Sequence, residues 1–100
     1  MALAGWPAVI LGSKHRFIGL AYLGADQPEQ AVPHLDRAVE DNRSLRVLRV
    51  RAQFDLARAL LRLSRPDGAR LMTVVQQEAA ELGMASLVSQ AAAEQKRSIG

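Results

Sequence analysis

The stretch from Ile18 to Asn42 reads IGLAYLGADQPEQAVPHLDRAVEDN and carries the clearest structural pattern in the chain. Apolar and small side chains recur at helical spacing on both sides of a short turn at Ala25–Pro28. The stretch therefore predicts two helices folded back on each other. The first helix is expected to bury one face, made of Ile18, Ala21, Tyr22 and Ala25. The second is expected to bury another, made of Ala31, Leu35, Ala38 and Val39.

A glycine lies inside the first of these helices, at Gly19. Glycine in a helix interior costs about 1 kcal/mol relative to alanine. The position is either simply tolerated, or it marks a place where another helix comes too close for a side chain. In the second helix the small residues Ala31 and Ala38 flank the larger Leu35, a pattern that lets two helices interlock closely.

The turn between the two helices carries its own signals. Asp26 is the predicted N-cap of the second helix, Pro28 lies in its first turn, and Glu29 follows the cap by three residues, as in a capping box. Pro33 removes one backbone donor, but it lies near the helix start, where the damage is limited.

The order of these residues resembles a tetratricopeptide repeat. The matching positions, at the spacings of that family, are Ile18, Gly19, Tyr22, Ala31, Leu35 and Ala38. Two positions depart from the pattern, because His15 stands where an early tryptophan is common and Arg43 where a closing proline is common. The resemblance implies an all-α fold of four to five antiparallel helices, stacked as a short α-solenoid of helical hairpins.

The remaining chain continues the helical pattern. The first helix is expected from Ser13 to about Gly24 and the second from Pro28 to Asp41; Ser44–Ser64, Ala69–Leu82 and Ala85–Lys96 are predicted to follow, with a turn at 65–68. Gly83 is the expected C-terminal cap of the fourth helix. The whole chain forms one domain: a remnant of a preceding element (1–12), repeat one (13–43), repeat two (44–83), a capping helix (84–96) and a tail (97–100).

The second hairpin is a looser copy of the first. Leu56, Ala57 and Leu60 take the places of Ile18, Gly19 and Tyr22, and Ala69 falls where Ala31 lies. Moving the next core positions of the fourth helix by one residue places the apolar Met72 and Val75 in them. The shift predicts that the second turn is one residue shorter than the first.

A wider resemblance extends across Gly12–Met84. The segments GSKHRFIGLAYLG, AVPHLDRAVEDN, AQFDLARALL and EAAELGM, with a Pro-Asp-Gly turn between the last two, carry it. Together they are similar to the helical repeat regions of bacterial signalling ATPases and LuxR-type transcriptional regulators, including cyclase-coupled forms. In that family this region lies after a nucleotide-binding core and senses or scaffolds. The family's phosphate loop and helix-turn-helix segment are not recognisable here, so the resemblance implies the interaction part of a transcriptional or signalling regulator, as a fragment or a stand-alone remnant.

Composition narrows the functional classes. A net charge of +3 is far from the clustered basic surface that phosphate binding needs, so nucleic acid is an unlikely partner. The chain has no cysteine, which fits a cytoplasmic protein, and its apolar start is too short to span a membrane and lacks a basic signal region. Because repeat arrays need about three units for stability, the apolar Trp6–Leu11 segment predicts either marginal stability or self-association.

Catalytic, cofactor and metal chemistry find no support in the sequence. His15 and His34 lie on consecutive helices without the ligand spacing of a metal site, and they are interpreted as partly exposed helix histidines. Ser13 and His15 are two apart on a helix and face different ways, so no nucleophile–base pair is formed. The chain is therefore expected to be no enzyme and to use no cofactor.

The expected function is a scaffold for protein–protein interaction or sensing. The first helix of each repeat in the family lines an inner groove, and an acidic peptide or protein segment is the predicted ligand. The residues expected in this groove are Arg16, Leu20, Leu23, Arg51, Phe54, Arg58 and Arg62. The alternative is a small nucleic-acid-binding helical protein that uses the arginine stripe of Arg51, Arg58 and Arg62, which contains Asp55 as its one acid.

Overall fold

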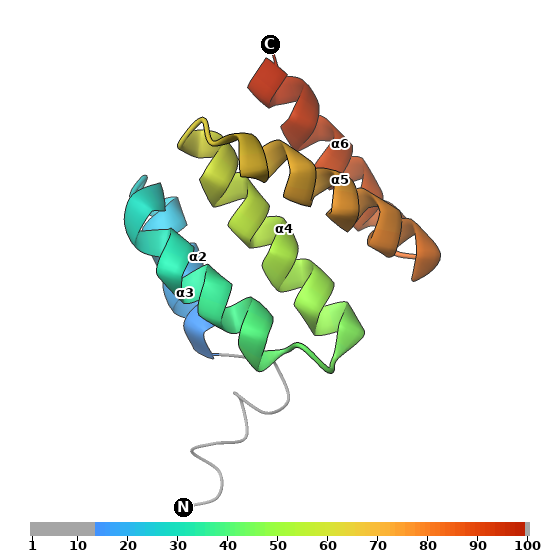
Figure 1. Cartoon of the computed structure of the whole chain (residues 1–100), viewed down its shortest axis with the longest axis horizontal. Coiled ribbons are helices and arrows are strands. Elements are labelled where there is room, and N and C mark those ends of the chain that lie inside the picture. Colours follow the sequence, from blue (N-terminus) through green and yellow to red (C-terminus); the bar gives the residue numbers. More distant parts are fainter. Residues whose placement is uncertain (1–13, 100) are drawn as a thin grey trace, which may run out of the picture.

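Helices account for all the regular structure that the computed structural model describes, which covers residues 14–99 (Figure 1). In chain order they are α2 (Lys14–Gly24), α3 (Pro28–Asp41), α4 (Arg46–Arg62), α5 (Pro66–Glu81) and α6 (Ala85–Ile99). The predicted all-α class is confirmed for this part of the chain. The expected remnant at 1–12 and the N-cap at Ser13 lie outside the described residues.

Each helix packs against the next along the chain, and α4 also contacts α2 and α6. Helix α4 consequently lies in the middle of the molecule, with α2 and α3 on one side and α5 and α6 on the other (Figure 1). The first hairpin is α2–α3 and the second is α4–α5, as the sequence predicted, while α6 packs mainly on α5.

The close approach of α2 and α3 explains the glycine in α2. A Cβ atom at Gly19 would lie 2.5 Å from Cγ and 2.6 Å from Cδ2 of Leu35. Leu35 is fully buried, as are Ala31 and Ala38 on either side of it. The expectation that a neighbouring helix passes too close for a side chain at Gly19 is confirmed.

The predicted buried face of α2 is wrong. Gly19 and Leu23 are the buried residues of this helix, whereas Ile18 is 38% exposed and Ala21 is exposed as well. The reason is that α3 and α4 both pack on the Gly19–Leu23 side of α2. The side that carries Ile18 and Ala21 faces neither helix.

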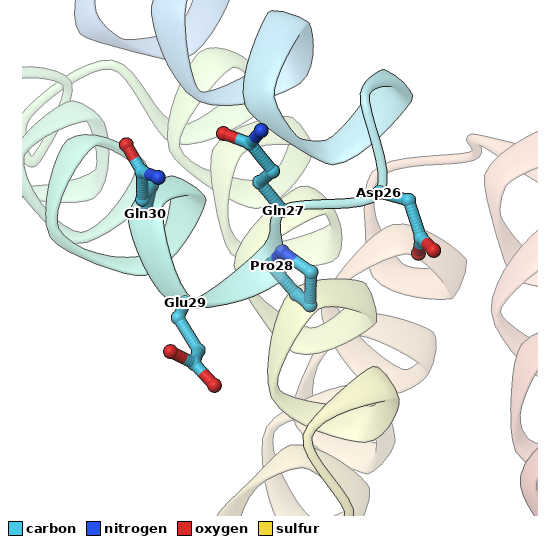
Figure 2. A pocket seen from close by; sticks show the side chains of 5 residues that line it. All are labelled: Asp26, Gln27, Pro28, Glu29 and Gln30. Atoms are coloured by element: carbon cyan, nitrogen blue, oxygen red, sulfur yellow. The ribbon is translucent and has the colours of Figure 1, made fainter.

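The turn after α2 differs from the predicted capping box. Asp26 has a left-handed backbone (φ 60°) and ends α2, since the Gln27 N–H donates to the Tyr22 carbonyl (2.8 Å) and the Asp26 N–H to the Leu23 carbonyl (3.1 Å). These two bonds form a Schellman motif. Gln27 is the N-cap of α3 and makes no side-chain capping bond. Figure 2 shows the carboxylates of Asp26 and Glu29 pointing outward on different sides of Pro28.

The turn after α4 repeats this geometry 38 positions later. Ser64 is left-handed (φ 56°), the Arg65 N–H donates to the Leu60 carbonyl and the Ser64 N–H to the Leu61 carbonyl, both at 3.0 Å. Pro66 then begins α5, as Pro28 begins α3. The second turn is therefore as long as the first, and the predicted one-residue shortening is wrong.

The one-residue offset between the core positions of the two hairpins lies in the buried face of α5 and not in the length of the turn. Met72 and Val75 are fully buried, as predicted, whereas Ala69 is exposed. Gly68 makes the close contact instead, since a Cβ there would lie 2.8 Å from the backbone nitrogen of Leu61. The predicted start of this helix at Ala69 is also wrong, because Pro66 to Gly68 already form its first turn.

The end of α5 follows the prediction. Gly83 is left-handed (φ 72°) and its N–H donates to the Ala80 carbonyl (3.1 Å), while the Met84 N–H donates to the Ala79 carbonyl (2.8 Å). Gly83 thus ends the helix in a third Schellman motif. Helix α6 continues to Ile99, three residues beyond its predicted end at Lys96.

The core consists of two apolar clusters, with α4 contributing to both. The first cluster joins α2 and α3 to α4 and contains Leu23, Ala31, Leu35, Leu56, Ala59 and Leu60. The second joins α4 to α5 and α6 and contains Val50, Phe54, Ala57, Met72, Val75, Ala79, Leu87 and Ala91. Between residues 14 and 99, no helix has both the length and the apolar character needed to cross a membrane.

Replacing Gly19 with alanine tests the close packing of the first hairpin. The new methyl group would overlap the buried Leu35 side chain, so we expect Gly19→Ala to lower the free energy of unfolding by about 1–3 kcal/mol. Gly24→Ala is the matched control, because no atom lies within 4 Å of the added Cβ and alanine favours the helix. Urea unfolding measures both variants. A gain in stability for Gly19→Ala would contradict the packing.

Candidate functional site: a basic recess on α2, α4 and α6

A recess of about 210 Å³ lies where three helices meet, and we call it the basic recess. Its lining comes from α2 (Arg16, Leu20), α4 (Arg51, Phe54, Asp55, Arg58) and α6 (Leu87, Gln90). These are the helices that α4 brings together, since it contacts both α2 and α6. Three guanidinium groups and one carboxylate share the lining with three apolar side chains.

The spacing on α4 explains how one helix supplies half of this lining. Arg51, Asp55 and Arg58 follow each other by four and three positions, so they lie along one stripe of the helix. Phe54 adjoins the stripe and is 7% exposed, because most of its ring packs into the second core cluster. The arginines therefore stand on a rigid, packed helix and not on a loop.

Asp55 forms the base of the basic recess. Its side chain is only 4% exposed; it accepts a hydrogen bond from Arg16 Nε at 2.8 Å and lies 3.6 Å from an Arg58 guanidinium nitrogen. Burial raises the pKa of Asp55 above its ordinary value of 3.8, and the positive charges of Arg16, Arg58 and Arg51 oppose this rise. The Arg16–Asp55 pair also ties α2 to α4.

All three arginines are at least partly exposed, and Arg51 is the most exposed of them. The Arg58 guanidinium lies 5.6 Å from the centre of the Phe54 ring, a cation–π contact that holds the group over an aromatic face. Arg51 is exposed, and its charge acts on Asp55. Because one buried carboxylate faces three cations, the basic recess keeps an excess of positive charge that an anionic group would complement.

The structure brings together five of the seven residues predicted for the groove. These are Arg16, Leu20, Arg51, Phe54 and Arg58. Leu23 is instead 2% exposed, because it packs in the first core cluster. Arg62 does not line the basic recess: it donates to the Leu23 carbonyl at 2.9 Å and lines a neighbouring hollow with Arg58, Glu94 and Arg97. The predicted groove positions of Leu23 and Arg62 are therefore corrected.

The sequence did not predict that α6 lines part of the basic recess. Leu87 and Gln90 are adjacent to the α4 stripe, but nothing in the sequence fixes how far α6 is rotated against α4. The sequence identifies Asp55 as the one acid among the arginines, but it does not predict that this side chain is buried. Its spacing from Arg51 and Arg58 was the signal available.

The two histidines pair with each other. His15 on α2 and His34 on α3 are half-buried, and their Nδ1 atoms lie 3.3 Å apart. Both rings stack in a column with Tyr22, with His34 in the middle. Across residues 14–99 no cluster of three or more His, Cys, Asp or Glu side chains is arranged to hold a metal ion. The pair joins α2 to α3, and neither histidine lines the basic recess.

A second hollow, of about 220 Å³, lies at the turn between α2 and α3 (Figure 2). Only the consecutive residues 26–30 line it, so no other helix contributes a group to it. Its charged side chains are the carboxylates of Asp26 and Glu29, which point outward. The basic recess, with groups from three helices, is the stronger candidate for a binding site.

Comparisons with known proteins give no match, whether with family models, curated proteins or solved structures. The geometry and chemistry of the basic recess are therefore the features of this chain that point to a function.

The pH dependence of stability tests the burial of Asp55. Because its pKa is raised in the folded state, the native protein holds this proton more tightly than the unfolded chain. The stability contributed by the neutral carboxyl is complete below pH 3.8 and is lost as the pH rises through the raised pKa. Asp55→Asn keeps a neutral group at every pH.

We therefore expect the parent to lose stability relative to Asp55→Asn as the pH rises from 3.8 across this window. Chemical unfolding at a series of pH values gives the difference directly. Asp36→Asn, which removes an exposed carboxylate on α3, is the control. A parent that instead gains stability over Asp55→Asn with rising pH would mean that the arginines outweigh burial.

Proposed function

We propose that this chain is a non-catalytic interaction module whose basic recess binds an acidic segment of a partner protein. The observation that carries the proposal is the convergence of Arg16, Arg51 and Arg58 on one recess with a single buried carboxylate. The recess, of about 210 Å³, is smaller than the pockets of about 300–1,000 Å³ that usually enclose small molecules, so it suits single side chains of a peptide better than a whole metabolite.

The chemistry of the lining favours carboxylates. An arginine guanidinium presents a planar fork of donors that matches a carboxylate in two parallel hydrogen bonds. Leu20, Phe54 and Leu87 lie among the arginines and offer contacts for an apolar side chain next to the acidic one. A ligand that alternates acidic and apolar residues fits this combination.

The helix arrangement supports a tetratricopeptide-like α-solenoid as the architecture of the module. Gly19 and Leu35 meet as the small and large positions of that repeat do, and the two hairpin turns share one geometry. The basic recess lies on α2, α4 and α6, the helices that would form the inner layer of such an array. We further propose that the chain is the interaction part of a bacterial regulator of the LuxR type and acts in the cytoplasm.

Binding of nucleic acid is the alternative, and the arginine positions favour it less. A phosphate backbone would need a continuous row of cations. Arg62 leaves the stripe to bond the Leu23 carbonyl, and Arg16 is occupied by Asp55. Salt-sensitive binding to random duplex DNA, at the same affinity as an acidic peptide, would favour this alternative.

Charge reversal in the basic recess tests the proposal. The double variant Arg51→Glu/Arg58→Glu should bind a fluorescent glutamate- and leucine-rich peptide at least about tenfold more weakly than the parent. The reason is that a hydrogen bond to a charged group contributes about 1.5–3 kcal/mol. Fluorescence anisotropy measures the affinity, and far-UV circular dichroism verifies that helicity is kept.

Arg37→Glu/Arg43→Glu is the matched control, because it makes the same change in net charge on and just after α3, away from the basic recess. This control should bind the peptide nearly as well as the parent. If both double variants lost the same amount of peptide affinity, the loss would follow from net charge alone and would contradict the proposed site. A parent that does not bind the peptide would contradict the ligand class.

A further inference from the structure

The first helices of the two hairpins, α2 and α4, carry corresponding apolar faces, but these faces have different neighbours. Counting 38 positions on from α2, the residues Ile18, Ala21 and Tyr22 correspond to Leu56, Ala59 and Leu60 of α4. The correspondence is structural, because both hairpins end their first helix in the same turn at Asp26 and Ser64. We call Ile18, Ala21 and Tyr22 the outer face of α2.

In α4 this face is a packing surface. Leu56 is 8% exposed, Ala59 is fully buried and Leu60 is 6% exposed. They are buried in the first core cluster, together with Ala31 and Leu35 of the preceding helix α3. The face of α4 is therefore covered by the part of the chain that comes before it.

In α2 the corresponding face has the same apolar character, but the described helices cover only its Tyr22 edge, where the ring stacks on His34 of α3. Ile18 is 38% exposed, Ala21 is exposed and Tyr22 is half-buried. The adjacent Phe17 is also 46% exposed. Large apolar side chains gathered on one side of a helix mark a surface that another element covers.

The residues immediately before α2 have the composition of such a cover. Positions 1–13 contain no charged residue, in a chain of which 23% of residues are charged, and they include Trp6 and the run from Ala8 to Leu11. Leu11-Gly12 also repeats the order of Leu82-Gly83, where the left-handed glycine ends α5. Ser13 directly precedes Lys14, the first residue of α2, so this segment is joined to the helix that carries the outer face.

We propose that the segment from Trp6 to Leu11 of the same chain docks on the outer face of α2, in the position that α3 takes against α4. Burying its apolar side chains against Ile18 and Ala21 removes both surfaces from water. The docked segment completes the packing of the first hairpin and leaves the basic recess, on the opposite part of α2, open.

Trp6 is the only tryptophan in the chain, so its fluorescence reports on this contact in the full-length protein. We expect acrylamide to quench Trp6 several-fold less efficiently than N-acetyltryptophanamide in the same buffer, and the emission to lie to the blue of that reference. In Ile18→Glu the quenching should rise toward the reference and the emission should shift to the red. Ala21→Gln is a milder second variant with the same expected direction.

Val74→Glu is the control, because Val74 is 43% exposed on α5 and lies outside this face. It should leave the fluorescence of Trp6 as in the parent, and circular dichroism verifies that each variant keeps its helices. The proposal would be overturned if acrylamide quenched Trp6 of the parent as efficiently as the free reference. It would also be overturned if the quenching of Trp6 were the same in both α2 variants as in the parent. Protection that disappears on dilution would also overturn it, and would identify a second copy of the chain as the cover.

Discussion

The rest of the structure depends on the two-sided packing of α4. One side of this helix buries Leu56, Ala59 and Leu60 against the first hairpin, and another buries Val50 and Phe54 against α5 and α6. A stripe of α4 that belongs to neither cluster carries Arg51, Asp55 and Arg58. The site thus lies on the most constrained element of the described chain. A short helical protein buries only a small core, so the packing on both sides of α4 is important for its stability.

The buried Asp55 connects this packing to the electrostatics of the site. Desolvation disfavours its charge, and Arg16 partly compensates by donating a hydrogen bond from α2. Arg16 is thereby held against Asp55, whereas Arg51 is exposed and Arg58, half-buried beside the same carboxylate, lies over the Phe54 ring. A partner with carboxylates would meet two guanidinium groups whose helix cannot easily move, so little ordering cost would oppose binding.

The sequence predicted what depends on local spacing. The helical segments, the close approach of another helix at Gly19, the burial of Met72 and Val75 and the shared stripe of Arg51 and Arg58 are all indicated by local sequence patterns. The errors concern relations between helices. Ile18 and Ala21 look like core residues but face away from α3, and Asp26 resembles an N-cap but adopts the left-handed conformation that ends α2. The rotation of α6, which brings Leu87 and Gln90 to the site, depends on tertiary packing that no local pattern records.

The most direct test of the account observes the arginine side chains themselves. In an NMR titration of the full chain with the glutamate- and leucine-rich peptide, the Nε–Hε signals of Arg51 and Arg58 should shift in a saturable way, and that of Arg16 should shift with them. Those of Arg37 and Arg43 should remain in place. Shifts of equal size at all five arginines would show diffuse attraction to a basic surface, and would contradict a binding site built on α4.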